Sequence, residues 1–326
     1  MSSGGKLNSI HALRGLASFW VCWFHLTRGG EAFPTWGPLR ASGSNGWLGV
    51  EMFFVISGFI IPYVLHKSRY TLGDFKNFAL KRLVRLEPPY LVSIGLILLL
   101  NYASTLSSLY KGPPFGVNVP QLLLHLGYLI PFSRYIWIND AFWTLAIEFQ
   151  YYLLLGLLFP FLMKNRAMGI LLTVLLMIAA CAIGTYKVVI RWFFLFFMGF
   201  LTFRRYAGLD RWPLSLLLLA VGFIGCCYTV GTSAAIAGIF AVWFILFFKY
   251  HNFAFEFLGN VSYSLYLIHI PTGGRVINLG SRFAVSELSQ VAVVFLALGV
   301  SLTCAWLLYR FVEKPAQEWA ASIRYR

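Results

Sequence analysis

The chain is a succession of long apolar segments separated by short polar ones. A bilayer core about 30 Å thick needs about 20 apolar helical residues per crossing. Ten such segments can be marked along the sequence: 10–28, 47–66, 88–106, 142–163, 168–186, 188–204, 213–230, 233–249, 255–278 and 289–312. The apolar piece 120–132 is bracketed by two prolines and is too short to cross alone, so we expect it to lie at the interface or to re-enter. The pattern predicts an all-α polytopic membrane protein, and without a repeat or a rich linker residues 1–326 are expected to form a single domain.

Composition supports this class. Hydrophobic residues make up 59% of the chain and charged residues 11%, whereas soluble domains are roughly 45–50% apolar and about 25% charged. A soluble fold of this length has no interior large enough for so much apolar surface. A soluble enzyme, a disordered chain and a nucleic-acid-binding domain are therefore all poor fits.

The net charge of +15 comes from 26 basic and 11 acidic residues, and most of the excess reads as a topology signal. Ten spans put both termini on one side, and 18 of the 26 basic residues then fall on that side. The other eight are Arg28, Arg40, Lys111, Arg134, Lys187, Arg191, Arg275 and Arg282. Basic residues accumulate in cytoplasmic loops, so we expect both termini in the cytoplasm.

Two ionisable residues lie inside the first predicted span. Arg14 stands at its cytoplasmic end and His25 follows 11 residues later, which places both on one helix face, about 16 Å apart along the axis. Ionisable groups within a span cost several kcal/mol unless they are paired or face a cavity. A snorkelling arginine and a packing histidine are the structural alternative; the alignment favours a functional pair.

Two acidic residues are expected at a similar depth. Glu51 lies near the outer end of the second span, with Ser57 near mid-membrane, and Glu148 lies six residues into the fourth span. A membrane carboxylate needs a partner, and His25 is the predicted partner of Glu148. An interfacial Glu51 and a purely structural Glu148–His25 pair remain alternatives.

Basic residues are interleaved with apolar ones over 75–90, as in an amphipathic helix on the cytoplasmic surface. Attraction to anionic lipid is the simpler reading. Lys81 precedes Arg82 and Arg85, which lie three residues apart on one face and are spaced to bind phosphate.

The ninth span carries a polar stripe of Ser262, Tyr266 and His269. Such a stripe either joins helices by hydrogen bonds or lines a site. The sequence has no phosphate-binding P-loop, no metal-ligand spacing and no serine-hydrolase elbow, so no metal is expected.

Six sequence motifs together resemble those of the acyltransferase type 3 family of integral membrane acyltransferases. They are L-R-G-L-A at 13–17 with His25 completing R-x10-H, G-V-E-M-F-F-V-I-S-G-F at 49–59, K-R-L-V-R-L-E-P-P-Y at 81–90, W-T-L-A-I-E-F-Q-Y-Y at 143–152, L-G-N-V-S-Y-S-L-Y-L-I-H at 258–269 and E-K-P at 313–315. They occur in the family's order and cover nearly the whole chain. One position departs: a second acid often follows the glutamate of the fourth motif, and here it is Phe149, which places more weight on Glu148 or Glu51. No esterase-like domain follows residue 326, so the stand-alone form is expected.

The resemblance implies transfer of an acyl group, usually acetyl, from cytoplasmic acyl-coenzyme A to a hydroxyl of a saccharide or a related acceptor. Donor-binding residues are expected at Arg14, Lys81, Arg82 and Arg85, and catalytic residues at His25, Glu148 and Glu51. Substrate contacts are expected at Ser57, Tyr151, Tyr266 and His269. His25 then acts either as general base for the acceptor hydroxyl or as a transient acyl carrier.

The location implied is the bacterial inner membrane, and the partners are acyl-coenzyme A, a saccharide or glycosylated small molecule, and lipid, without nucleic acid. Acceptor choice is expected in the outer loops 29–46 and 107–140. The competing function is a proton-coupled transporter or a flippase of a saccharide or lipid-linked glycan, in which Arg14, His25 and Glu148 line a proton path. The lack of repeat symmetry and the cytoplasmic arginine cluster count against it.

Overall fold

The computed structural model describes residues 4–28, 33–108, 110, 112–250 and 252–325, and its regular structure there is entirely helical. The helices are α1 (Gly4–Arg28), α2 (Gly37–Ser42), α3 (Gly49–Lys67), α4 (Phe75–Thr105), α5 (Val119–Leu126), α6 (Trp143–Lys164), α7 (Arg166–Ala182), α8 (Phe193–Tyr206), α9 (Trp212–Thr229), α10 (Thr232–Phe247), α11 (Phe253–Gly280), α12 (Glu287–Leu308) and α13 (Lys314–Ser322). Short helical turns join them: η1 (Gly46–Leu48), η2 (Leu72–Asp74), η3 (Ile130–Phe132), η4 (Asp140–Phe142), η5 (Val189–Trp192) and the π-helical η6 (Tyr309–Glu313). The all-α prediction is confirmed.

A helix occupies each of the ten apolar ranges. Within the described chain, five helical stretches are long and apolar enough to cross a membrane: Gly37–Lys67, Leu72–Thr105, Asp140–Lys164, Trp212–Thr229 and Glu287–Ser322. The chain is therefore an integral membrane protein by the length and composition of its helices, and the count of ten crossings stays a prediction. Helices α7 and α10 are apolar but shorter.

The amphipathic segment and the third predicted span form one helix, α4. A reciprocal capping box between Thr71 and Asp74 precedes it, and Pro88 and Pro89 lie inside it. A proline removes an intrahelical hydrogen bond, and neighbouring helices can satisfy backbone groups near such a break. Here the hydroxyl of Tyr263 on α11 donates to the carbonyl of Leu86 at 2.9 Å. The basic residues of the amphipathic part are thereby fixed to the membrane-embedded part.

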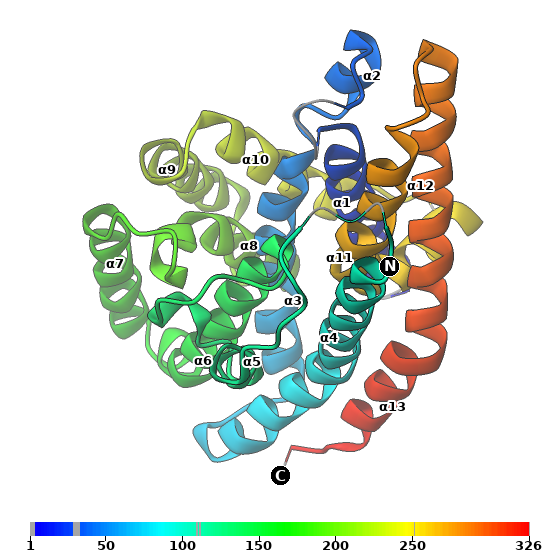
Figure 1. The fold of residues 1–326 in the computed structure, drawn as a ribbon. Coiled ribbons are helices and arrows are strands. Elements are labelled where there is room, and N and C mark those ends of the chain that lie inside the picture. The colour runs from blue at the N-terminus through cyan, green and yellow to red at the C-terminus, as the bar shows by residue number, and fades with distance from the viewer. Residues whose placement is uncertain (1–3, 29–32, 109, 111, 251, 326) are drawn as a thin grey trace.

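Close helix pairs form the interior, where α1 packs against α11 and α3 against α8. Figure 1 shows α1, α3 and α11 between the outer helices α12 and α7. A side chain on Gly58 would strike the backbone of Phe196, and one on Gly199 the backbone of Val55. The two glycines therefore let α3 and α8 approach closely, as small residues do in membrane helix packing.

Candidate functional site

A cavity of about 500 Å³ lies among α1, α3, α4, α6, α11 and η6. We call it the basic cavity, because all four predicted donor-binding residues line it. Its charged and hydroxyl-bearing lining consists of Arg14, Ser57, Lys81, Arg82, Arg85, Thr144, Glu148, Tyr152, Tyr263, Tyr266 and Glu313. The structure therefore brings together residues from the first, second, fourth and ninth predicted spans and from the amphipathic segment.

None of the four cations forms an ion pair within the described part of the chain. Arg82 is buried against the rings of Phe78 and Tyr152, with its guanidinium carbon 5.3 Å and 5.5 Å from their centroids. The Lys81 ammonium donates to the carbonyl of Ile323 at 3.3 Å. Arg14 interacts electrostatically with Arg85. Glu148 and Glu313 line the same cavity and also interact with Arg14. The four cations outnumber these two carboxylates, and the resulting positive potential favours an anionic ligand.

Glu148 takes its hydrogen bonds inside the basic cavity. One carboxylate oxygen, Oε1, accepts from Ser57 Oγ and from Tyr152 Oη, both at 2.5 Å. Hydrogen bonds of this length to a carboxylate are the strong, charge-assisted kind. The predicted partner His25 lines a different cavity, so the structure places Glu148 with Ser57 and Tyr152 and not with His25.

A second cavity of about 360 Å³, the histidine cavity, is lined by His25 and His269 together with Asn139, Asp140 and other residues. The two imidazole centroids are 5.1 Å apart. The Nδ1 atom of His269 lies 2.9 Å from the carbonyl oxygen of Leu265, which can only accept, so Nδ1 carries the hydrogen. Nε2 is then an acceptor; it is buried and has no hydrogen-bond partner among the described residues.

Asp140, which the sequence reasoning passed over, is the carboxylate of the histidine cavity. It lies in η4 directly before α6 and interacts electrostatically with His25. The sequence does carry a signal for it, because Asp140 is one of only 11 acidic residues and lies two positions before a predicted span. The structure thus puts a carboxylate near His25, and it comes from a turn rather than from a span.

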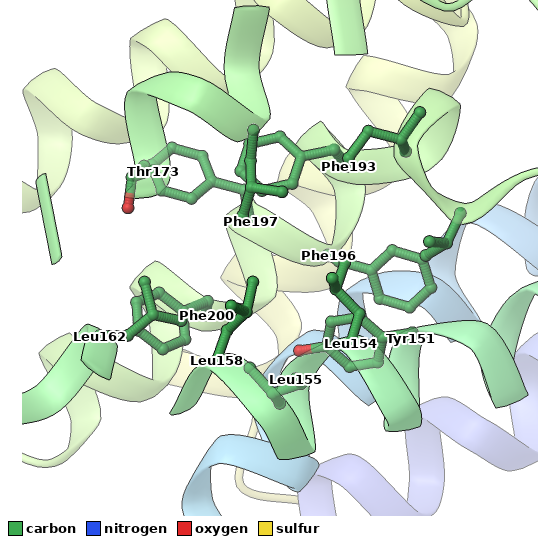
Figure 2. A pocket seen from close by; sticks show the side chains of 13 residues that line it. Tyr151, Leu154, Leu155, Leu158, Leu162, Thr173, Phe193, Phe196, Phe197 and Phe200 are labelled. Atoms are coloured by element: carbon green, nitrogen blue, oxygen red, sulfur yellow. The ribbon is translucent and has the colours of Figure 1, made fainter. Parts of the chain in front are cut away.

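Two predicted site residues lie away from both cavities. Glu51 is 3% exposed and lines neither, and its Oε2 has no hydrogen-bond partner among the described residues. Tyr151 stacks on Phe196 with ring centroids 4.0 Å apart. It lines a narrow apolar pocket of about 50 Å³ between α6 and α8, shown in Figure 2. The Tyr151 hydroxyl has no hydrogen-bond partner in the described part of the chain.

Tyr266 lies between the two cavities. It lines the basic cavity, and its ring is 6.0 Å from that of His269 in the histidine cavity. Its hydroxyl donates to the carbonyl of Ala141 at 3.1 Å and is 2.7 Å from Thr144 Oγ1. The polar stripe predicted on this helix therefore serves both purposes, because Tyr266 joins α11 to η4 and α6 and also lines a site.

Comparison with known proteins gives one family. The model of the acyltransferase domain family, Acyl_transf_3, matches residues 7–310. Among curated proteins, the O-acetyltransferases OatA of Staphylococcus aureus strains NCTC 8325 and COL are each 26% identical over 337 residues, covering 84% of this chain and 53% of the relative. The chain thus spans about half the length of the curated relatives it matches. No solved structure matches it.

Proposed function

The chain belongs to this family of membrane acyltransferases, and we propose that it transfers an acyl group, acetyl in the first instance, from cytoplasmic acyl-coenzyme A to a hydroxyl of a saccharide acceptor. The observation that carries the proposal is the pair of cavities on either side of Tyr266. One is lined by four unpaired cations and the other by two histidines. The relatives' names, O-acetyltransferase, agree with acetyl and an oxygen acceptor.

The basic cavity supports binding of the donor. Coenzyme A carries several phosphates, and arginine binds phosphate through paired N–H groups. Arg14, Arg82 and Arg85 come from two helices and line the same space. In the proposed arrangement these residues hold the phosphates, and the thioester end extends past Glu148 toward Tyr266.

The histidine cavity supports activation of the acceptor. The acceptor's oxygen attacks the thioester carbonyl, so a C–O bond forms and the C–S bond breaks. His25 takes the hydroxyl proton, as a neutral imidazole can, and the departing thiolate then takes up a proton. Asp140 orients His25, and the free Nε2 of His269 accepts a hydrogen bond from the acceptor.

We further propose ten crossings, both termini in the cytoplasm, and a location in a bacterial inner membrane. Two observations support this topology. The basic residues divide 18 to 8 across the predicted membrane. In addition, all four cations of the basic cavity are among the 18 basic residues on the predicted cytoplasmic side. In the histidine cavity, Asp140 lies just outside the outer end of one predicted span and Arg275 lies near the outer end of another. Donor and acceptor then approach from opposite sides.

The test uses purified protein in lipid nanodiscs, radiolabelled acetyl-coenzyme A and a panel of glycans. His25→Ala is expected to abolish transfer while the protein still binds coenzyme A, because His25 lies outside the basic cavity. His66→Ala is the control, since His66 is exposed and lines neither cavity. Arg14→Ala is expected to raise the KM for the donor. Full activity of His25→Ala, or an unchanged donor KM in Arg14→Ala, contradicts the assignment.

A further inference from the structure

A third space, which we call the outer groove, has a volume of about 480 Å³ and opens beside the histidine cavity. The residues used below are Asn101, Ser104, Tyr110, Arg275, Asn278 and Arg282. Asn101, Arg275 and Asn278 line both the outer groove and the histidine cavity. The two spaces are therefore adjacent, and the side chains that separate them belong to both.

Arg275 stands at the junction and is held in place from two sides. One terminal nitrogen donates to the carbonyl of Pro271 at 3.0 Å, and the other donates to Asn101 Oδ1 at 2.6 Å. A guanidinium has five N–H groups, so these bonds fix its orientation and leave others for a ligand. The same contact uses the oxygen of the Asn101 side chain and leaves its amide N–H groups as donors.

Both charged side chains in the described lining of the groove are basic. Two arginines line it, Arg275 and Arg282, and no described carboxylate does. The nearest acid in the adjoining space is Asp140, which faces the histidine cavity. Arginine pairs with carboxylate or phosphate through two parallel N–H bonds, so the groove is suited to an anion.

The remaining lining is suited to a sugar. Asn101 and Asn278 offer amide groups, Ser104 a hydroxyl, and Tyr110 a partly exposed ring. Amides and hydroxyls both donate and accept, as sugar hydroxyls require. The arginines favour an acidic sugar over a neutral one, and the residues shared with the histidine cavity favour an acceptor over a lipid headgroup.

We propose that the outer groove binds an acidic saccharide, with its carboxylate or phosphate on Arg275 and Arg282 and the hydroxyl to be acylated in the histidine cavity. This rests on the proposed function and deepens it, because it names the class of acceptor. It adds the ends of α4 and α11 to the loop 107–140 expected from the sequence, whose Tyr110 also lines the groove. Arg275 and Arg282 are then specificity-determining residues.

The test compares three trisaccharides as acceptors: trigalacturonate, its carboxyl-reduced neutral counterpart and a phosphorylated neutral trisaccharide. Wild-type protein is expected to bind at least one acidic probe about tenfold or more tightly than the neutral one, the size of one charge-assisted contact. Arg275→Gln is expected to remove that preference by weakening binding of the acidic probe, whereas Arg275→Lys retains part of it. Preference for carboxylate over phosphate, or the reverse, identifies the anion.

Arg134→Gln is the matched control, because Arg134 is another basic residue of the predicted outer side that does not line the groove. Arg282 is exposed, so Arg282→Gln provides a second variant if Arg275→Gln fails to fold. Binding is measured by calorimetry, and acyl transfer is measured separately. If the wild-type protein binds the acidic probe but transfers no acyl group to it, that result contradicts the proposed function and not this inference. Equal binding of acidic and neutral probes overturns the inference. So does a preference that is present in phosphatidylcholine nanodiscs and lost in phosphatidylglycerol nanodiscs at the same ionic strength, because an anionic lipid headgroup then occupies the arginines.

Discussion

Replacing Arg85 with glutamine tests whether this residue binds the donor or stabilises the fold. Arg85 lines the basic cavity, has no ion pair in the described chain, and interacts with Arg14. Like charges about 8 Å apart repel by about 2 kcal/mol at an effective dielectric constant near 20, and by less where water fills the cavity. Arg85 also interacts electrostatically with Glu313, which offsets part of this repulsion, so without donor Arg85→Gln is expected to leave the thermal midpoint nearly unchanged.

With donor present the expectation reverses. A charge-assisted hydrogen bond to phosphate contributes about 1.5–3 kcal/mol, so its loss weakens coenzyme A binding about 10- to 100-fold. At a ligand concentration of about 100 Kd the wild-type protein gains about 2.7 kcal/mol from binding, and a variant with a 100-fold higher Kd gains only about 0.4 kcal/mol. The measurement is the thermal midpoint of the purified protein with and without coenzyme A.

Arg204→Gln is the control with the opposite pattern. Arg204 makes two hydrogen bonds to buried Asp210, from Nε at 2.6 Å and from a terminal nitrogen at 2.8 Å. Breaking this pair leaves a buried carboxylate without its partner and costs about 2 kcal/mol, while the response to coenzyme A stays intact. If Arg85→Gln destabilises the donor-free protein as much as Arg204→Gln does, or retains the full response to coenzyme A, the phosphate assignment is refuted.

Three further predictions concern the two cavities and their surroundings. Glu148→Gln keeps an oxygen that can accept from Ser57 and Tyr152 but removes the charge, so we expect an intact fold and acyl transfer at least about tenfold slower; a steady-state assay with normal kcat contradicts a role in the reaction. Tyr266→Ala opens the space between the cavities and is expected to raise the rate at which acetyl-coenzyme A is hydrolysed without acceptor. Tyr266→Phe keeps the ring between the cavities and is expected to keep the low rate. The measurement is release of free coenzyme A, and equal rates in the wild-type protein and both variants contradict a role for the Tyr266 ring as a barrier between the cavities. His125 lies on α5 outside the candidate spans, and burial lowers its pKa to about 4. The folded protein holds it neutral, with Nδ1 toward Tyr90 Oη and Nε2 accepting from the Ile138 N–H, so its contribution to stability is expected to be present above about pH 6.5 and to be lost as the pH falls toward 4. His125→Gln should flatten the unfolding midpoint across that range, and an unchanged pH dependence contradicts this.

The helices were predictable because a membrane imposes one length and one polarity on each crossing. The basic cavity was partly predictable for the same reason. Arg14 was conspicuous inside an apolar span, and Arg82 and Arg85 share a face of one helix. Helical periodicity places residues on a face and at a depth, and here that was sufficient to group the cations.

Partners across helices were not predictable in this way. Glu148 and His25 were matched by depth alone, and depth does not say which helices are neighbours. The packing of α3 against α6 gives Glu148 the hydroxyl of Ser57. Asp140 was missed because it lies in a turn, where no periodicity points to a facing residue. Continuity of α4 through two prolines depends on contacts with α11 that the local sequence does not reveal.

The turn η4 contacts Tyr266 and also contributes a carboxylate to the cavity that holds His25. Asp140 lines the histidine cavity, and the next residue, Ala141, uses its carbonyl to accept hydrogen bonds from both Tyr266 and Thr144. In the proposed reaction the thioester reaches the acceptor beside His25 by displacing Tyr266, and that movement breaks a hydrogen bond to the residue next to Asp140. The Asp140 carboxylate near His25 and the carbonyl that accepts from Tyr266 therefore belong to the same short turn. Arrival of the donor's thioester and the orientation of His25 are expected to be coupled through η4, because Tyr266 bonds the carbonyl of the residue next to Asp140.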